Sequence, residues 1–338
     1  MADVAALAGV SSQTVSRVLA GSENVRDDTR QVVMDAIRQL DYHPNTAARR
    51  LATGRTRTIG LVMLETLSYS RSAIWHGVER ASRAGGYEMS TAGIDALTTS
   101  QVARALRRLI AQGVDGLVLS VPLVEVDTSV DVLIRTVPTV AIDGGRTSSC
   151  DLVAVDQYAA GVTATRHLLE LGHETVWYVS GPELWSETVG RTAGWRDTLV
   201  QAGAEQPPIM HGDWTPESGY RCGRLLGRAP DVTAIFAAND DMAFGLMHAL
   251  RELGRDVPAE VSVVGMDDTP FAPYAAAPLT TIRQSFAKVA DRAVERLLSV
   301  IERGAGSGGG HAELLQPELI RRASTAPHRP RGRAGRGE

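Results

Sequence analysis

Residues 3–19 read DVAALAGVSSQTVSRVL and contain two short amphipathic segments separated by a glycine. In the first segment Val4 and Leu7 lie one helical turn apart, so we expect both to face inward. Gly9 ends this segment, and Ser11 stands where an N-cap is favoured, because its side-chain oxygen can accept a hydrogen bond from a free backbone N–H. A helix, a short turn with glycine and a second helix are the sequence form of a helix-turn-helix.

The second segment, residues 12–19, divides into an apolar and a polar face. Val15 and Val18 are predicted to face inward. The opposite face carries four polar side chains that are candidates for DNA contact: Ser12, Gln13, Ser16 and Arg17. Glutamine and arginine have planar, two-pronged groups that match the edges of adenine and guanine in the major groove. The alternative for this stretch alone is an ordinary three-helix bundle with a polar surface.

A third amphipathic segment and a basic stretch follow. The third segment carries five apolar residues at helical spacing, which we expect to close a small core: Val32, Val33, Ala36, Ile37 and Leu40. From Asn45 to Thr58 the chain is rich in alanine and has no acidic residue. We expect the arginines of this stretch to attract phosphate groups and to make the affinity for DNA sensitive to salt: Arg49, Arg50, Arg55 and Arg57.

These segments together resemble the lactose-repressor/purine-repressor family of bacterial transcription regulators. The resemblance is carried by the strings Asp3-Val4-Ala5, Ala8-Gly9-Val10-Ser11, Thr14-Val15-Ser16-Arg17-Val18-Leu19 and Tyr42-His43-Pro44-Asn45. It implies that residues 1–44 form a helix-turn-helix DNA-binding head and that residues 45–57 form a hinge helix and linker.

The resemblance also implies roles for individual residues. It places Ser12, Gln13 and Arg17 at base-reading positions. The hinge helix, which enters the minor groove in this family, would contain Asn45, Ala48 and Leu51, with the leucine as an apolar wedge between two base pairs. Arg26 stands where the family's third helix begins with a serine cap, so Asp27 or Asp28 is expected to cap that helix.

Composition and length agree with a head and two further lobes. The chain has 338 residues and a net charge of only −4. It therefore lacks the strongly positive overall charge of a protein that binds nucleic acid over its whole surface. Its two cysteines have no metal or redox spacing, and no metal or cofactor is expected. The sequence contains no Gly-x-Gly-x-x-Gly after a predicted strand and no phosphate-binding loop, so neither motif points to an enzyme. Without a leader or a long apolar run, we expect a cytoplasmic protein that does not span a membrane.

From Thr58 to Met266 short β-branched runs alternate with helical segments in two successive series. Such alternation predicts an α/β protein with parallel sheets covered by helices on both faces. We therefore expect an all-α head followed by two doubly wound parallel-sheet lobes of the periplasmic-binding-protein type. The predicted N-terminal lobe comprises residues 58–157 and 284–313, the C-terminal lobe residues 158–283 and 314–326, and a disordered basic tail residues 327–338.

Polar and aromatic side chains follow several of the predicted strands. In open α/β sheets a ligand binds outside the carboxyl ends of the strands, so these loops are the places to search. Six residues are candidates for binding a small effector: Asp143, Arg191, Trp214, Asn239, Asp267 and Gln284. A sugar has an apolar face for an aromatic ring and a rim of hydroxyls for two-pronged polar groups. A single carboxylate after a strand is more often a helix cap or a surface charge.

The family resemblance extends through the lobes. It is carried by Arg191-Thr192-Ala193-Gly194-Trp195, Gly212-Asp213-Trp214, Ala238-Asn239-Asp240, Val264-Gly265-Met266-Asp267-Asp268 and Leu279-Thr280-Thr281-Ile282-Arg283-Gln284. It implies that the six candidates bind a galactoside-like sugar, with Trp214 stacked on the ring, and that a homodimer then releases a palindromic operator in double-stranded DNA. The alternatives are a solute-binding sugar receptor without a transcriptional role and a corepressor-dependent regulator with a non-sugar effector.

Overall fold

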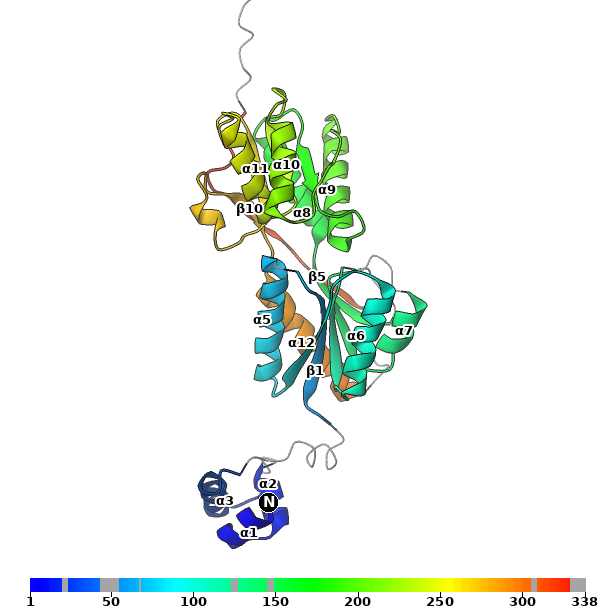
Figure 1. Ribbon diagram of the computed structural model, residues 1–338, viewed down its shortest axis with the longest axis vertical. Coiled ribbons are helices and arrows are strands. Elements are labelled where there is room, and N and C mark those ends of the chain that lie inside the picture. Colours follow the sequence, from blue (N-terminus) through cyan, green and yellow to red (C-terminus); the bar gives the residue numbers. More distant parts are fainter. Residues whose placement is uncertain are drawn as a thin grey trace, which may run out of the picture. The chain divides into compact units, whose positions relative to one another are not determined.

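The computed structural model describes residues 1–19, 24–42, 55–66, 68–122, 127–144, 149–304 and 309–328 (Figure 1). The chain divides into two compact units, Met1–Thr56 and Arg57–Glu338. The expected hinge positions Asn45, Ala48 and Leu51 lie outside the described residues, as do residues 329–338 of the expected tail.

The N-terminal unit is a three-helix head formed by α1 Ala2–Ala8, α2 Ser12–Leu19 and α3 Asp27–Gln39. Gly9 ends α1 in the left-handed conformation (φ 65°), which glycine adopts without steric cost. The predicted cap of α2 is confirmed, because the Thr14 N–H donates to Ser11 Oγ at 3.1 Å. The core of the head is small and apolar, and its buried side chains are Val4, Ala5, Val15, Val18, Val33 and Ala36.

Three residues expected in this core are largely exposed. The exposed fractions of Leu7, Val32 and Leu40 are 47%, 49% and 43%, so the prediction that they face inward is wrong. In so small a unit much of the surface of each helix stays in water, and the inward stripe of α3 is narrow. Its buried residues are Val33 and Ala36, and the partly buried Ile37 packs against the same core.

The start of α3 also differs from the prediction. The residue before this helix is Arg26, which provides no side-chain cap. Asp27 and Asp28 lie inside the first turn, so the expectation that one of them caps the helix is wrong. Their carboxylates still favour the helix, because the positive end of its dipole lies at the first turn.

The first lobe is built on a six-stranded parallel sheet with the order β11-β5-β4-β3-β1-β2. Its strands are β1 Thr58–Leu64, β2 Glu88–Ile94, β3 Gly116–Ser120, β4 Thr139–Ile142, β5 Asp151–Val155 and β11 Ala312–Leu315. One face packs against α5 Tyr69–Ala84 and α12 Phe286–Arg303, and the other against α6 Thr99–Ala111 and α7 Thr128–Ile134 (Figure 1).

The second lobe has a sheet of the same size with the order β12-β10-β9-β8-β6-β7. Its strands are β6 Trp177–Ser180, β7 Met210–His211, β8 Ala234–Ala237, β9 Ser262–Asp267, β10 Thr280–Arg283 and the antiparallel edge strand β12 Glu318–Ile320. Helices pack in pairs, α8 Gln157–Glu170 with α9 Ser186–Ala202 and α10 Pro216–Leu226 with α11 Asp240–Glu252. A short 3-10 helix, Ala272–Tyr274, separates β9 from β10.

The predicted fold class, a helical head followed by two parallel-sheet lobes, is confirmed. Four elements, α7, β10, β11 and β12, were not predicted from the sequence. The segments AELL of β11 and ELI of β12 contain few of the β-branched and aromatic residues that are typical of strands. β11 runs to Leu315, whereas the sequence boundary for the first lobe was placed at residue 313.

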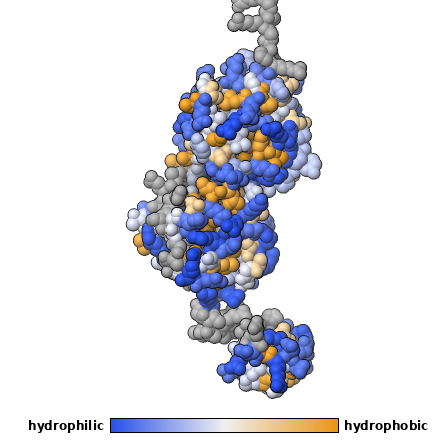
Figure 2. Space-filling model, turned by 180° about the vertical axis from the view of Figure 1, so that it is seen from behind, coloured by the Kyte–Doolittle hydropathy of each residue, from blue (hydrophilic) through white to orange (hydrophobic). Residues whose placement is uncertain are grey.

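The surface of the protein is mainly hydrophilic, with apolar patches on each lobe (Figure 2). The most exposed large apolar side chains are Leu184, Phe271 and Tyr274. In the described part of the chain, no helix combines the length and the apolar character needed to cross a membrane.

Candidate functional site

The second helix of the head presents a polar face to solvent. Val15 and Val18 are buried in the core, which turns the remaining face of α2 outward. All four side chains predicted to contact DNA are exposed on this helix: Ser12, Gln13, Ser16 and Arg17. The head therefore offers amide, guanidinium and hydroxyl groups on one short helix, the arrangement that helix-turn-helix proteins use for reading base edges.

A cavity of about 270 Å³ opens between the two lobes. The structure brings all six predicted effector residues together in its lining: Asp143, Arg191, Trp214, Asn239, Asp267 and Gln284. They come from both lobes and from the crossing between them, because Asp143 follows β4, Asp267 ends β9 and Gln284 follows β10. A ligand in this cavity touches both lobes at once.

Three of these residues hold a backbone conformation that is rare outside glycine. The φ angles of Asp143, Trp214 and Asp267 are 62°, 73° and 117°. Such conformations cost about 1–3 kcal/mol each and persist only where the surrounding structure holds them. Non-glycine residues in this region cluster at functional sites, and here the three side chains line one cavity.

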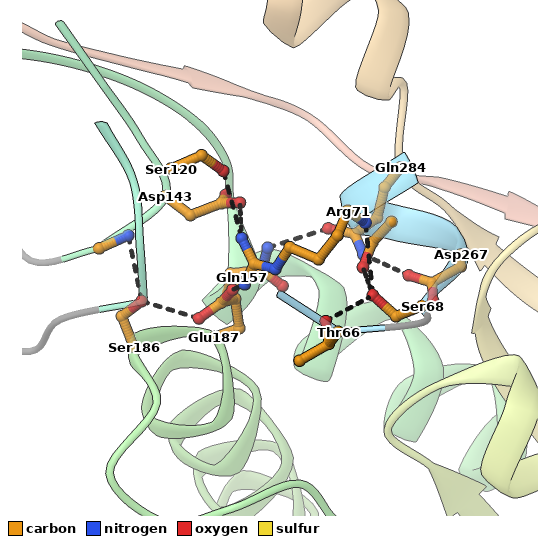
Figure 3. Close-up of polar contacts among 12 residues, drawn as sticks. Thr66, Ser68, Arg71, Ser120, Asp143, Gln157, Ser186, Glu187, Asp267 and Gln284 are labelled. Atoms are coloured by element: carbon orange, nitrogen blue, oxygen red, sulfur yellow. Dashed lines mark hydrogen bonds and ion pairs between the residues drawn. The ribbon is translucent and has the colours of Figure 1, made fainter. Parts of the chain in front are cut away.

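A hydrogen-bonded network fixes the polar groups on the side of the cavity formed by the second lobe. Arg191 Nε donates to Gln157 Oε1 at 2.8 Å, and Gln157 Nε2 donates to Gln284 Oε1 at 2.9 Å. Gln284 Nε2 in turn donates to Asp267 Oδ1 at 2.6 Å. Arg191 also donates to the carbonyl oxygen of Ala238. The network orients an arginine and a carboxylate toward the same space (Figure 3 shows its Gln157, Gln284 and Asp267 members).

Trp214 forms an aromatic wall of the cavity. Its backbone oxygen accepts a hydrogen bond from Asn239 Nδ2 at 3.0 Å, while Asn239 Oδ1 caps α11. The Arg191 guanidinium lies 5.3 Å from the centre of the indole ring, within range of a cation–π interaction. Trp214 Nε1 is buried and has no hydrogen-bond partner among the described residues. A ligand hydroxyl would supply one.

Two neighbouring carboxylates, Asp240 and Asp268, turn away from the cavity and hold the surrounding loops. Asp240 accepts from the Thr269 N–H at 2.7 Å and from Thr281 Oγ1 at 2.6 Å. Asp268 accepts from Arg283 Nε at 2.7 Å. Both therefore support the loops that carry Asp267 and do not line the cavity themselves.

The opposite end of the cavity holds a cluster that the sequence analysis did not identify (Figure 3). Arg71 from α5 donates to Glu187 Oε1 at 2.8 Å and to Ser120 Oγ at 3.3 Å, and its Nη1 lies 3.9 Å from Asp143 Oδ2. Trp185 covers the guanidinium at 5.5 Å and tilts against Trp214 with ring centres 5.6 Å apart. Glu187 and Trp185 follow β6 and obey the same strand-end rule as the predicted residues. Arg71 gives no such sequence signal.

Burial changes the protonation of two cavity carboxyls. Removal from water raises the pKa of Asp267 to about 8, against the opposing charge of Arg191. Removal from water and the nearby Glu187 carboxylate raise the pKa of Asp143 to about 7, although Arg71 and Arg191 act in the opposite direction. Both carboxyls can therefore donate or accept a hydrogen bond near neutral pH.

A helix-turn-helix head joined to a two-lobed α/β body is the architecture of a DNA-binding regulator, and the polar cavity is a candidate site for a small ligand. Residues 1–45 match the bacterial regulatory proteins of the lacI family, and residues 165–325 match the periplasmic binding protein-like domain. The HTH-type transcriptional repressor PurR of Haemophilus influenzae is 34% identical over 330 residues, with 95% of this chain and 97% of that protein covered. The chain belongs to the lacI family of regulators and is a DNA-binding transcriptional repressor.

Solved structures agree with this assignment. The lac repressor dimer bound to operator and the anti-inducer ONPF has a TM-score of 0.87 and 31% identity, with 96% of this chain and 98% of that chain covered. The complex of the transcriptional regulator CelR with cellobiose has a TM-score of 0.72 and 32% identity, with 95% and 98% covered. Membership of the family decides against the alternative of a solute receptor without a transcriptional role.

Proposed function

We propose that the protein is a homodimeric repressor that releases a palindromic operator when a small, galactoside-like sugar binds between its lobes. The observation that carries this proposal is the cavity lined by Trp214 together with Asp143, Arg191, Asn239, Asp267 and Gln284. An indole ring suits the apolar face of a pyranose, and the fixed amide, carboxyl and guanidinium groups suit its hydroxyls. A relative of the same fold, CelR, has been solved with cellobiose.

The proposed mechanism is a shift between two lobe orientations. Because the cavity is lined from both lobes, a sugar that fits one lobe orientation better favours that orientation. The size of the shift is set by the difference in the sugar's affinity for the two orientations. In our proposal the hinge residues Asn45, Ala48 and Leu51 enter the minor groove in the DNA-bound form and withdraw when the lobes reorient. Ser12, Gln13, Ser16 and Arg17 would contact the major groove. A repressor with this role works beside the chromosome, in the cytoplasm.

Arg191→Ala tests this proposal. The variant loses the guanidinium that stands over Trp214 in the cavity lining and donates to Gln157. We expect it to bind operator like the wild type and to lose sugar-dependent release. The matched control is Arg196→Ala, which removes an arginine from the exposed face of the same helix, α9. Release of operator by Arg191→Ala at the sugar concentration that releases the wild type would contradict the proposed site.

A further inference from the structure

The end of the cavity near Arg71 is closed by three consecutive residues that reach from the second lobe onto the first. Trp185 packs against the apolar core of the first lobe. The Ser186 N–H donates to the Pro122 carbonyl oxygen at 3.3 Å, and Ser186 Oγ accepts from the Gly144 N–H at 3.1 Å. Glu187 forms the ion pair with Arg71 (Figure 3). The pair therefore joins the two lobes directly at the cavity wall.

The Arg71 guanidinium is held by contacts within the protein. Its side chain is 3% exposed and that of Glu187 is 9% exposed, so the ion pair is shielded from water. One nitrogen binds Glu187, another binds Ser120, and the Trp185 ring covers the guanidinium. A ligand carboxylate at Arg71 would compete with Glu187 for the same guanidinium.

Acidic side chains outnumber basic ones in the lining of the cavity. Five carboxyl side chains and two guanidinium groups line it; the acidic residues are Asp143, Glu187, Asp213, Asp241 and Asp267, and the basic ones Arg71 and Arg191. At the Arg71 end the two carboxyls of Asp143 and Glu187 face one arginine. A carboxylate on a ligand at this end would compete with Glu187 for Arg71 and would be repelled by the Glu187 carboxylate and, where it is ionised, by Asp143, in a site where burial strengthens charge interactions.

We propose that Arg71 and Glu187 are specificity determinants that restrict the effector to uncharged sugars and exclude sugar acids. This inference rests on the proposed function, because it names the class of sugar that the same cavity accepts.

Two pairs of probes test the proposal on the full-length chain. Methyl β-D-galactopyranoside and methyl β-D-glucopyranoside are each compared with the uronate in which the C6 hydroxymethyl is a carboxylate. Isothermal titration calorimetry gives the Kd of each probe and hence the preference for the neutral member. We expect the wild type to prefer the neutral member by about tenfold or more.

The decisive variant is Glu187→Gln. It keeps the shape of the side chain and an oxygen that accepts from Arg71, but removes one repelling charge. We expect it to lower the preference for the neutral sugar by about tenfold. Glu217→Gln, the same change on an exposed side chain of α10, serves as the control and should leave the preference unchanged. If Glu187→Gln does not fold, Asp143→Asn removes the second repelling charge and should change the preference in the same direction.

The possible outcomes separate the two proposals. If a neutral sugar binds and Glu187→Gln leaves the preference unchanged, or if the wild type binds the uronate more tightly, the specificity proposal is wrong and the sugar-responsive function stands. If neither member of either pair binds the wild type, both proposals fail.

Discussion

Gly181→Ala should weaken sugar binding without disturbing the fold or the DNA-binding head. A Cβ atom at Gly181 would lie 2.1 Å from Cζ2 and 2.2 Å from Cη2 of Trp214. Carbon atoms in contact are about 3.5–4 Å apart, so the indole must move by roughly 1.5 Å. The three atoms nearest to the new methyl group all belong to the indole of Trp214. This is the group proposed to stack on the sugar.

The size of the effect follows from the cost of overpacking. Forcing an extra methylene into a packed site costs about 1–3 kcal/mol. If the indole must return to its original place to stack on the sugar, this strain appears in the bound state. Since 1.4 kcal/mol corresponds to about tenfold in Kd, we expect sugar affinity to fall by roughly five- to 150-fold.

Calorimetric titration with a neutral methyl glycoside that binds the wild type measures this loss. The matched control is Gly223→Ala, whose Cβ would lie 2.8 Å from the Leu246 carbonyl oxygen between α10 and α11, in packing that does not line the cavity. We expect this control to lower the Tm and to keep the sugar affinity. Wild-type sugar affinity in a folded Gly181→Ala protein would refute the role given to Trp214.

Three further predictions concern the head and the cavity carboxyls. Arg17→Ala should abolish the preference for operator over random DNA in a filter-binding assay while weak, salt-sensitive binding remains; an unchanged preference would contradict the role of α2. Ser11→Ala removes the cap seen at Thr14 and should destabilise the head by about 1 kcal/mol in thermal unfolding, whereas no loss would show that the cap is dispensable. Burial raises the pKa of Asp267 from 3.8 to about 8, so the folded protein holds a proton that the unfolded chain releases, and this contribution to stability is lost as pH rises toward 8. The Tm should therefore fall more between pH 5 and pH 8 in the wild type than in Asp267→Asn, and equal falls would count against a buried, protonated carboxyl.

Much of the site could be predicted because it follows from local sequence and one topological rule. Asp143 and Asp267 end or follow strands of parallel sheets, and the carboxyl ends of such strands meet at one edge. Asn239 is the N-cap of α11, two residues after the end of β8, and there it both caps the helix and lines the cavity. For these residues, placing the strands was sufficient to place the side chains.

The Arg71–Glu187 pair could not be predicted in the same way. Its two residues are 116 positions apart and belong to different lobes. Their contact depends on how the start of α9 packs onto the first lobe, which no periodicity or motif records. The exposure of Leu7 and Val32 has a similar origin, because the angle between packed helices decides which side of an apolar stripe remains in water.

The measurement that most directly tests the account is sugar-dependent release of DNA by the full-length protein. A duplex selected from random sequence by this chain, labelled for fluorescence anisotropy, is titrated with protein and then with a neutral methyl glycoside. We predict that the wild type dissociates as the sugar fills the cavity, while Arg191→Ala stays bound at the same concentration. A sugar that binds the cavity by calorimetry and leaves the affinity for this duplex unchanged would contradict the account.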